Sequence, residues 1–140
     1  MKDYWKMISV KDFGFGVLIF ALVITISLLQ PSNKVLVEFE DTSVNVKSAK
    51  YTMNIPYSMV DTIELVQKPD MGIIVDGHDD MILQTGIWSN DTWGEYHVCS
   101  EIVTDNCIVI HLNDGRTFVI SRRNNEETAA VYEEFSAHLS

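Results

Sequence analysis

The chain has 140 residues and a net charge of −10. The acidic excess lies beyond residue 29, where eighteen Asp and Glu residues stand against seven Lys and Arg residues, which gives −11. The electrostatic field of this negative charge repels nucleic acid and anionic lipid head groups. Binding of either would also need clustered Lys and Arg. We therefore expect neither nucleic-acid binding nor phosphoinositide binding.

An apolar segment precedes this acidic part. The seventeen residues from Phe13 to Leu29 (residues 13–29) include no charged side chain. At about 1.5 Å of rise per residue, a helix of this length covers roughly 25 Å, which is enough to cross the hydrocarbon core of a bilayer. The run is longer than the apolar part of a signal peptide, and no A-x-A-like cleavage site follows it. The sequence therefore predicts a basic leader over residues 1–12, a transmembrane helix over 13–30 and a linker over 31–34.

The lysines near this segment predict its orientation. Lys2, Lys6 and Lys11 precede it, whereas only Lys34 follows closely. Lys and Arg are enriched on the cytoplasmic side of a span. We therefore expect a single-pass protein of the cell membrane, embedded in lipid through residues 13–29, with its N-terminus in the cytoplasm and its domain outside.

Residues 35–140 form one predicted domain, in which apolar and polar residues alternate in short runs typical of strands. The middle, residues 71–85, is predicted to be irregular. Asn113, Asp114 and Gly115 give the strongest hairpin signal in the chain. The turn around Asn106 is expected to join two strands in the same way. The predicted strands cover residues 34–40, 43–47, 51–55, 61–66, 95–99, 107–112 and 116–121.

The last residues change to a helical period. Asn124 or Asn125 can cap a helix, and Val131, Phe135 and Leu139 fall on one face together with His138. The predicted fold class is therefore mainly β (α+β): an antiparallel β-barrel or sandwich of six to seven strands, capped by a C-terminal α-helix and preceded by one transmembrane helix.

Three stretches resemble a known family. The run from Ile55 to Leu65, IPYSMVDTIEL, resembles the opening of bacterial pleckstrin-homology-like (PH-like) domains. Gly86-Ile-Trp followed by Gly94-Glu-Tyr looks like their middle, and residues 107–121 ahead of a helix are similar to their last hairpin and capping helix. The likeness covers roughly residues 35–139 and implies a PH-like barrel, of a kind commonly tethered to membranes. The first hairpin has Asp41, Thr42 and Ser43 where lipid-binding PH domains cluster Lys and Arg.

One cluster of side chains suits a cation. Asp76, His78, Asp79 and Asp80 fall within five residues, and carboxylates with an imidazole can hold a metal ion. Their spacing does not fit the EF-hand loop, and a solvated acidic turn explains them equally well. No cofactor is expected.

Three aromatic residues are candidates for binding a partner. Trp88 and Trp93 are five residues apart and Tyr96 follows them. Because the two tryptophans cannot share one regular face, we expect one in the core and one at the rim, where it could anchor a partner beside Tyr96. The alternative is that both tryptophans pack in or against the barrel.

The two cysteines, Cys99 and Cys107, leave two possibilities open. They flank a predicted turn, so a cross-strand disulfide could form in an oxidising compartment. The other possibility is two small buried or half-buried thiols, because two cysteines do not make a disulfide framework.

No catalytic motif is present: the serines lack a G-x-S-x-G elbow, and no glycine-rich phosphate loop occurs. We therefore expect no enzyme activity. The predicted function is a non-catalytic module that binds a protein or peptide. One alternative is a structural or assembly subunit of a membrane complex, through self-association or packing on another membrane protein. The other is a metal site at Asp76–Asp80.

Overall fold

A computed structural model describes residues 17–19, 21, 34–48, 51–101 and 105–140. The chain divides into two compact units, Met1–Pro31 and Ser32–Ser140. In the first unit residues 17–19 and 21 are helical. The remainder of the predicted transmembrane segment, and the predicted leader, lie outside the described residues. Over the part of the chain that the structure describes, no helix has the length and apolar character needed to cross a bilayer.

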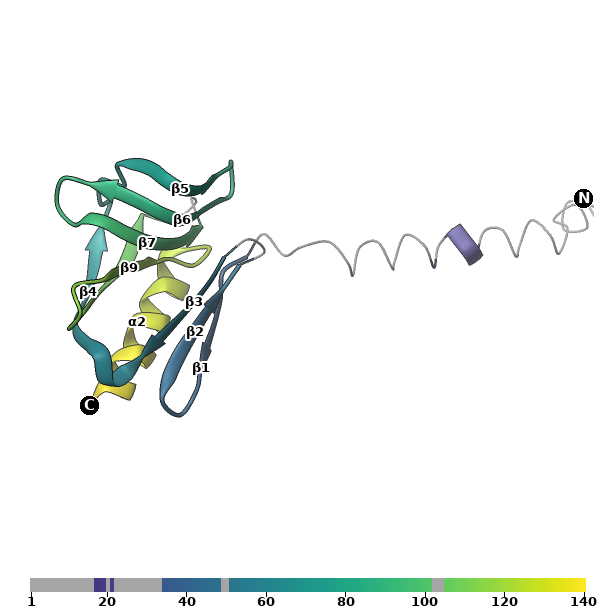
Figure 1. Cartoon of the computed structure of the whole chain (residues 1–140). Coiled ribbons are helices and arrows are strands. Elements are labelled where there is room, and N and C mark those ends of the chain that lie inside the picture. The colour runs from purple at the N-terminus through teal and green to yellow at the C-terminus, as the bar shows by residue number, and fades with distance from the viewer. Residues whose placement is uncertain (1–16, 20, 22–33, 49–50, 102–104) are drawn as a thin grey trace, which may run out of the picture. The chain divides into compact units, whose positions relative to one another are not determined.

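The second unit is mainly β, with two sheets and a C-terminal helix (Figure 1). Its described residues form nine strands, so the predicted number of six to seven is too low. The elements are β1 (Leu36–Phe39), β2 (Ser43–Lys47), β3 (Thr52–Pro56), the 3-10 turn η2 (Tyr57–Met59), β4 (Val60–Gln67), β5 (Ile73–Asp79), β6 (Leu83–Asn90), β7 (Gly94–Glu101), β8 (Asn106–Leu112), β9 (Thr117–Ile120) and α2 (Asn125–Leu139).

The first sheet has the order β1-β2-β3 and the second the order β4-β8-β9-β7-β6-β5. All neighbouring strands are antiparallel except β7 and β9, which are parallel. The predicted all-antiparallel order is therefore wrong at this point, and β7 and β8 do not form the expected hairpin. The strand β9 lies between them because its four residues are all buried, which suits the middle of a sheet better than its edge.

The two additional strands come mostly from residues 71–85, which the sequence predicted to be irregular. This region forms β5 and the first part of β6. Alternation is missing in β5 because nearly all of its residues are exposed, so no buried face imposes a period of two. A β-bulge between Ile74 and Asp76 breaks the register further.

The second sheet is strongly curled. Its two edge strands, β4 and β5, run in the same direction, yet only residues 68–72 connect them. A flat sheet would separate these edges by about 24 Å, and the connection would also have to return along a strand. Five residues span at most about 20 Å from Gln67 to Ile73. The sheet must therefore curl until the end of β4 approaches the beginning of β5.

A hydrophobic core lies on each face of the curled sheet. The larger core joins it to β1–β3 and α2, and the smaller core fills the other face. The larger core includes Val35, Val44, Val46, Met53, Ile55, Leu83, Cys99, Ile108, Ile110, Leu112, Phe118, Ile120 and Phe135. The smaller core includes Trp88, Tyr96, Val98, Cys107, Val109 and Val119.

The C-terminal helix forms as predicted. The side chain of Asn124 caps it by accepting a hydrogen bond from the backbone N–H of Glu127 at 2.7 Å. Phe135 is 1% exposed, and Val131 and Leu139 pack against the same core. The helix packs against β4 and β8, and in Figure 1 it lies between the two sheets.

The imidazole of His138 fastens the end of this helix to the first sheet. It lies between the rings of Phe39 and Tyr57, with both ring centroids at 5.1 Å and nearly parallel planes. All four predicted residues of the helix face, Val131, Phe135, His138 and Leu139, thus contact the domain.

Candidate functional site

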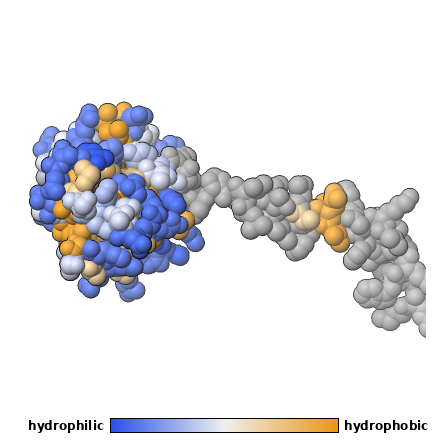
Figure 2. Space-filling view, turned by 60° about the horizontal axis from the view of Figure 1, so that its bottom comes forward, coloured by the Kyte–Doolittle hydropathy of each residue, from blue (hydrophilic) through white to orange (hydrophobic). Residues whose placement is uncertain are grey.

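Among the described residues of the domain, the free edge of β5 has the longest run of exposed large apolar side chains. This strand ends the order of the second sheet, and no described strand pairs with its outer side. Ile73 is 71% exposed and Val75 is 49% exposed, with Ile74 also exposed between them. Figure 1 shows β5 at the outer edge of the sheet. Figure 2 shows one face of the domain, where small hydrophobic patches interrupt a largely hydrophilic surface.

The turn after β5 is apolar as well. Met81 and Ile82 form the tip of the β5–β6 hairpin, and Met81 is 93% exposed. The turn is closed by Asp80, whose backbone N–H donates to the carbonyl oxygen of Leu83 at 3.1 Å. The carboxylate of Asp80 accepts hydrogen bonds from the backbone N–H groups of Ile82 and Leu83, each at 2.7 Å. The exposed apolar tip is thus held in a defined conformation.

The opposite edge of the same sheet, β4, has a different character. Its exposed residues include Asp61 and Glu64, and only Leu65, at 39%, is a strongly exposed large apolar residue on this strand. Charged side chains on an edge strand discourage the addition of another chain. Two exposed acidic residues, Asp76 and Asp79, also lie on β5. The two edges therefore differ in their apolar residues, because β5 exposes three consecutive large apolar side chains whereas β4 exposes one.

The hydrogen-bonding groups of β5 alternate between its two sides. Asp80 and Leu83 form a hydrogen-bonded pair at the turn, so the pairs alternate from there along the hairpin. Asp79 and Gly77 therefore direct their backbone N–H and C=O groups away from β6. These groups are available to pair with an added strand.

A hollow of about 260 Å³ opens at the beginning of β5. Its walls come from the β4–β5 connection, the first residue of β5 and the β6–β7 turn. It is lined by Asp70, Gly72, Ile73, Ser89, Asn90 and Asp91.

Asn90 holds the walls of this hollow together. Its side-chain Nδ2 donates to the carbonyl oxygen of Asp70 at 2.7 Å. Its Oδ1 accepts hydrogen bonds from the backbone N–H groups of Thr92 at 3.1 Å and Trp93 at 2.7 Å. The hydrogen bonds of Asn90 thereby hold the β4–β5 connection at Asp70 against the β6–β7 turn, although Asp70 and Asn90 are twenty residues apart in the sequence.

The predicted cation ligands are distributed along β5 and its turn. Asp76, His78 and Asp79 belong to the strand, whereas Asp80 begins the turn. His78 Nε2 lies 3.4 Å from the Asp80 carboxylate, but the four side chains do not converge. Within the residues that the structure describes, no group of three or more His, Cys, Asp or Glu side chains is arranged to hold a metal ion.

The three aromatic candidates lie in or against the smaller core. Trp88 is 3% exposed and Tyr96 is 1% exposed, so both are core residues whose rings a partner cannot reach. Trp93 is half-buried and packs edge-on against Tyr96, with 5.1 Å between ring centroids. One tryptophan in the core and the other packed against it fits the prediction of one core and one rim residue, and it fits the alternative that both pack in or against the barrel equally well. Burial raises the pKa of the Tyr96 hydroxyl, which donates a hydrogen bond to the carbonyl oxygen of Met71.

The two cysteines are free thiols. Cys99 belongs to the larger core and Cys107 to the smaller one, and their strands β7 and β8 are separated by β9. A disulfide between them is therefore excluded, and of the two predicted possibilities the buried thiols are correct. Burial raises the pKa of each thiol to about 11.

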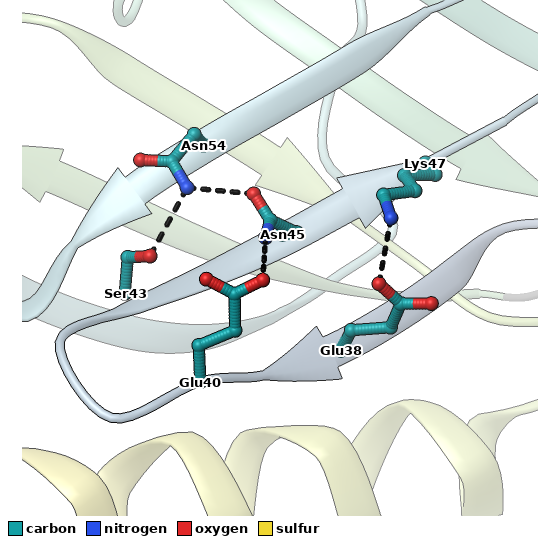
Figure 3. A network of polar contacts seen from close by, with 6 residues as sticks. All are labelled: Glu38, Glu40, Ser43, Asn45, Lys47 and Asn54. Atoms are coloured by element: carbon teal, nitrogen blue, oxygen red, sulfur yellow. Dashed lines mark hydrogen bonds and ion pairs between the residues drawn. The ribbon is translucent and has the colours of Figure 1, made fainter.

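The outer face of the first sheet is polar and internally paired (Figure 3). Lys47 contacts Glu38 at 2.7 Å. Asn54 donates to Asn45 at 2.6 Å and to Ser43 at 3.0 Å, and Asn45 donates to Glu40. Lys47 is the only basic residue of β1–β3. Among the described residues of these three strands, the one cation is therefore already paired with a carboxylate.

The exposed edge of β5 was not predicted from the sequence. The available signal was the run Ile73-Ile-Val75 followed closely by Met81 and Ile82, within a region with few other features. Consecutive apolar residues usually indicate a buried strand. Only the structure shows that the side chains on both faces of this strand are exposed.

Comparison with known proteins gives one result. Residues 35–134 match the family described as Bacterial PH domain. No curated protein and no solved structure matches the chain. The matched range includes all the strands that the structure describes and most of α2. The chain therefore belongs to the bacterial PH domain family.

Proposed function

We propose that the PH domain is a non-catalytic module that binds an extended segment of another protein by adding it as a strand to β5. The observation that carries this proposal is the open edge of β5, with Ile73 and Val75 exposed beside it. Strand addition takes affinity from main-chain hydrogen bonds and specificity from side-chain contacts. Exposed apolar edge strands are rare in soluble proteins unless something covers them.

The edge suits a linear segment better than a small molecule. Its apolar side chains are spread along the strand from Ile73 to the turn at Ile82. The outward backbone groups of Gly77 and Asp79 lie between these two ends. An extended chain can contact all of them at once, because its residues repeat at the same spacing as those of β5.

Selection from a random library of displayed ten-residue peptides tests this function. Selected peptides are expected to bind the wild-type domain and to lose most of their affinity for Val75→Lys, because a charged side chain on the edge opposes pairing. Leu65→Lys is the matched control, since it makes the same kind of change at an exposed position of β4. Selected peptides that bind both variants equally well, or a selection without any enriched peptide, would contradict the proposal.

We also propose that residues 13–29 anchor this module in the membrane, with the PH domain outside the cytoplasm. The support is the uncharged seventeen-residue run and the three lysines that precede it. The protein is expected to remain with membranes in alkaline carbonate, and protease added to spheroplasts should remove the domain. Recovery in the soluble fraction would contradict the anchor, and protection from the protease would contradict the orientation.

A further inference from the structure

We infer that the segment added to β5 carries a Lys or Arg side chain that enters the hollow at the beginning of this strand. The inference rests on the proposed strand addition and deepens it by specifying the chemistry of the partner. It is carried by the position of the hollow, by its apolar wall and by the charge that surrounds it.

The hollow adjoins the open edge directly. Ile73 is both a wall of the hollow and the first residue of β5. A strand that pairs with β5 therefore passes the mouth of the hollow, and one of its side chains can enter. The backbone of Gly72 lies close to β6, and a Cβ there would be 2.0 Å from the carbonyl oxygen of Ser89. Glycine at this position therefore leaves the hollow without a side chain on this wall.

The walls suit an amphipathic cationic side chain. Asp70 lies on the β4–β5 connection and Asp91 on the β6–β7 turn, so an acidic residue stands on each of two walls. Ile73 supplies apolar surface for the methylene groups of Lys or Arg, whose charged head remains among polar groups. The Asp70 carboxylate already accepts a hydrogen bond from Gly72 N–H through Oδ1 at 3.0 Å, which fixes its position.

The charge of the surrounding sequence favours the same partner. Between residues 68 and 95, six acidic residues stand against a single base, Lys68. The domain as a whole carries −11 beyond residue 29. This field attracts a cationic segment and accelerates its association. A second copy of the domain would bring the same negative charge to the edge, so the partner we infer is a basic segment of a different protein.

Peptides from the selection described above test the inference. We expect the β5-dependent peptides to share a Lys or Arg at one position. Replacing that side chain by citrulline, when it is Arg, or by norleucine, when it is Lys, removes the charge and should weaken binding at least tenfold. Raising NaCl from 50 to 500 mM should weaken the charged peptide more than the neutral one, because exposed charges are screened by salt.

The matching change in the domain is the double variant Asp70→Asn and Asp91→Asn. The amide introduced by Asp70→Asn retains an oxygen for Gly72 N–H, so the shape of the hollow is kept. In this variant the charged and neutral peptides should bind within about twofold of each other. The control is Asp61→Asn with Glu64→Gln, which removes two charges from the β4 edge and should leave the tenfold preference unchanged.

The two proposals fail in different ways. If the selected peptides lose binding with Val75→Lys but carry no shared basic residue, or if Asp70→Asn with Asp91→Asn leaves the preference intact, the cationic pocket is wrong while strand addition stands. If no peptide depends on β5, both proposals are wrong. A doubled mass of the wild-type domain in light scattering, restored to that of a monomer by Val75→Lys, would show that a second copy occupies the edge and would overturn the inference.

Discussion

Gly77 on β5 and Gly86 on β6 lie directly opposite each other. Gly86 has φ +101°, and a Cβ there would lie 2.5 Å from the carbonyl oxygen of Asp76. A Cβ at Gly77 would lie 2.1 Å from the carbonyl oxygen of Thr85. Only glycine permits this approach of the two backbones next to the bulge. The pairing of β5 with β6 therefore depends on these two glycines.

Gly86→Ala should therefore destabilise the domain by roughly 2–4 kcal/mol, since it combines an unfavourable backbone conformation with backbone overlap. Gly115→Ala is the matched control. Gly115 has φ +91° but nothing within 4 Å of an added Cβ, so only the conformational cost of about 1–2 kcal/mol remains. Urea unfolding measures both values, and equal losses would show that the contact between β5 and β6 is not tight.

Cys99 and Cys107 should react slowly with a maleimide in the native domain and rapidly after unfolding. Both are buried, and burial raises the pKa of each thiol to about 11, which leaves little thiolate at neutral pH. The intact mass of protein purified without reductant should correspond to two free thiols. A mass lower by about 2 Da, restored by reduction, would indicate an intramolecular disulfide and contradict the placement of β9 between β7 and β8.

His97 should make the domain less stable as the pH falls. Burial lowers its pKa below the usual 6.5, and Arg116 lowers it further. Above pH 6.5 both folded and unfolded chains hold a neutral imidazole, so there is no contribution. As the pH falls through 6.5 the unfolded chain binds the proton first, and the folded state loses relative stability until its own lower pKa is reached.

Replacing His97 by Gln should reduce the difference in unfolding free energy between pH 7 and pH 5. Tyr51→Phe keeps the imidazole but removes the hydroxyl that lies 2.6 Å from His97 Nδ1, so it measures how much of the pH dependence depends on this hydrogen bond. Denaturant unfolding at both pH values checks this, and an unchanged dependence in His97→Gln would contradict the assignment.

Phe135→Ala should cost about 3–5 kcal/mol, because the ring is 1% exposed and links the helix to the larger core. Glu133→Ala changes an exposed position of the same helix and should stay within about 0.5 kcal/mol of the wild type. Thermal and urea unfolding of the two variants give the comparison. A small loss for Phe135→Ala would mean that the helix does not close the domain.

Local signals in the sequence predicted the elements that depend on local chemistry. Asn113, Asp114 and Gly115 predicted the β8–β9 hairpin, which is closed by a hydrogen bond from Leu112 N–H to the Arg116 carbonyl oxygen at 2.9 Å. Asn124 or Asn125 was predicted to cap α2, and Asn124 is the cap. Both predictions succeeded because turn and cap residues act on their immediate neighbours.

Features set by contacts between distant residues were not predicted. The parallel pairing of β7 with β9 joins His97 to Phe118, and nothing local marks it. Trp88 and Tyr96 are of residue types that often bind partners, but both are buried, and their burial depends on the curl of the whole sheet. Asp76 and its neighbours were a candidate cation site in the sequence. In the structure they lie on an edge strand and its turn, and the exposed apolar residues of that strand indicate a binding edge.

Backbone hydrogen exchange in the bound domain tests strand addition most directly. The amides of Gly77 and Asp79 face away from β6, so they should exchange rapidly in the free domain, whereas the amide of His78 should be protected by pairing within the hairpin. When a selected peptide binds, Gly77 and Asp79 should become protected in the same alternating pattern, with little change along β4. Protection that appears on β4 instead, or binding that leaves Gly77 and Asp79 exchanging as before, would contradict the account.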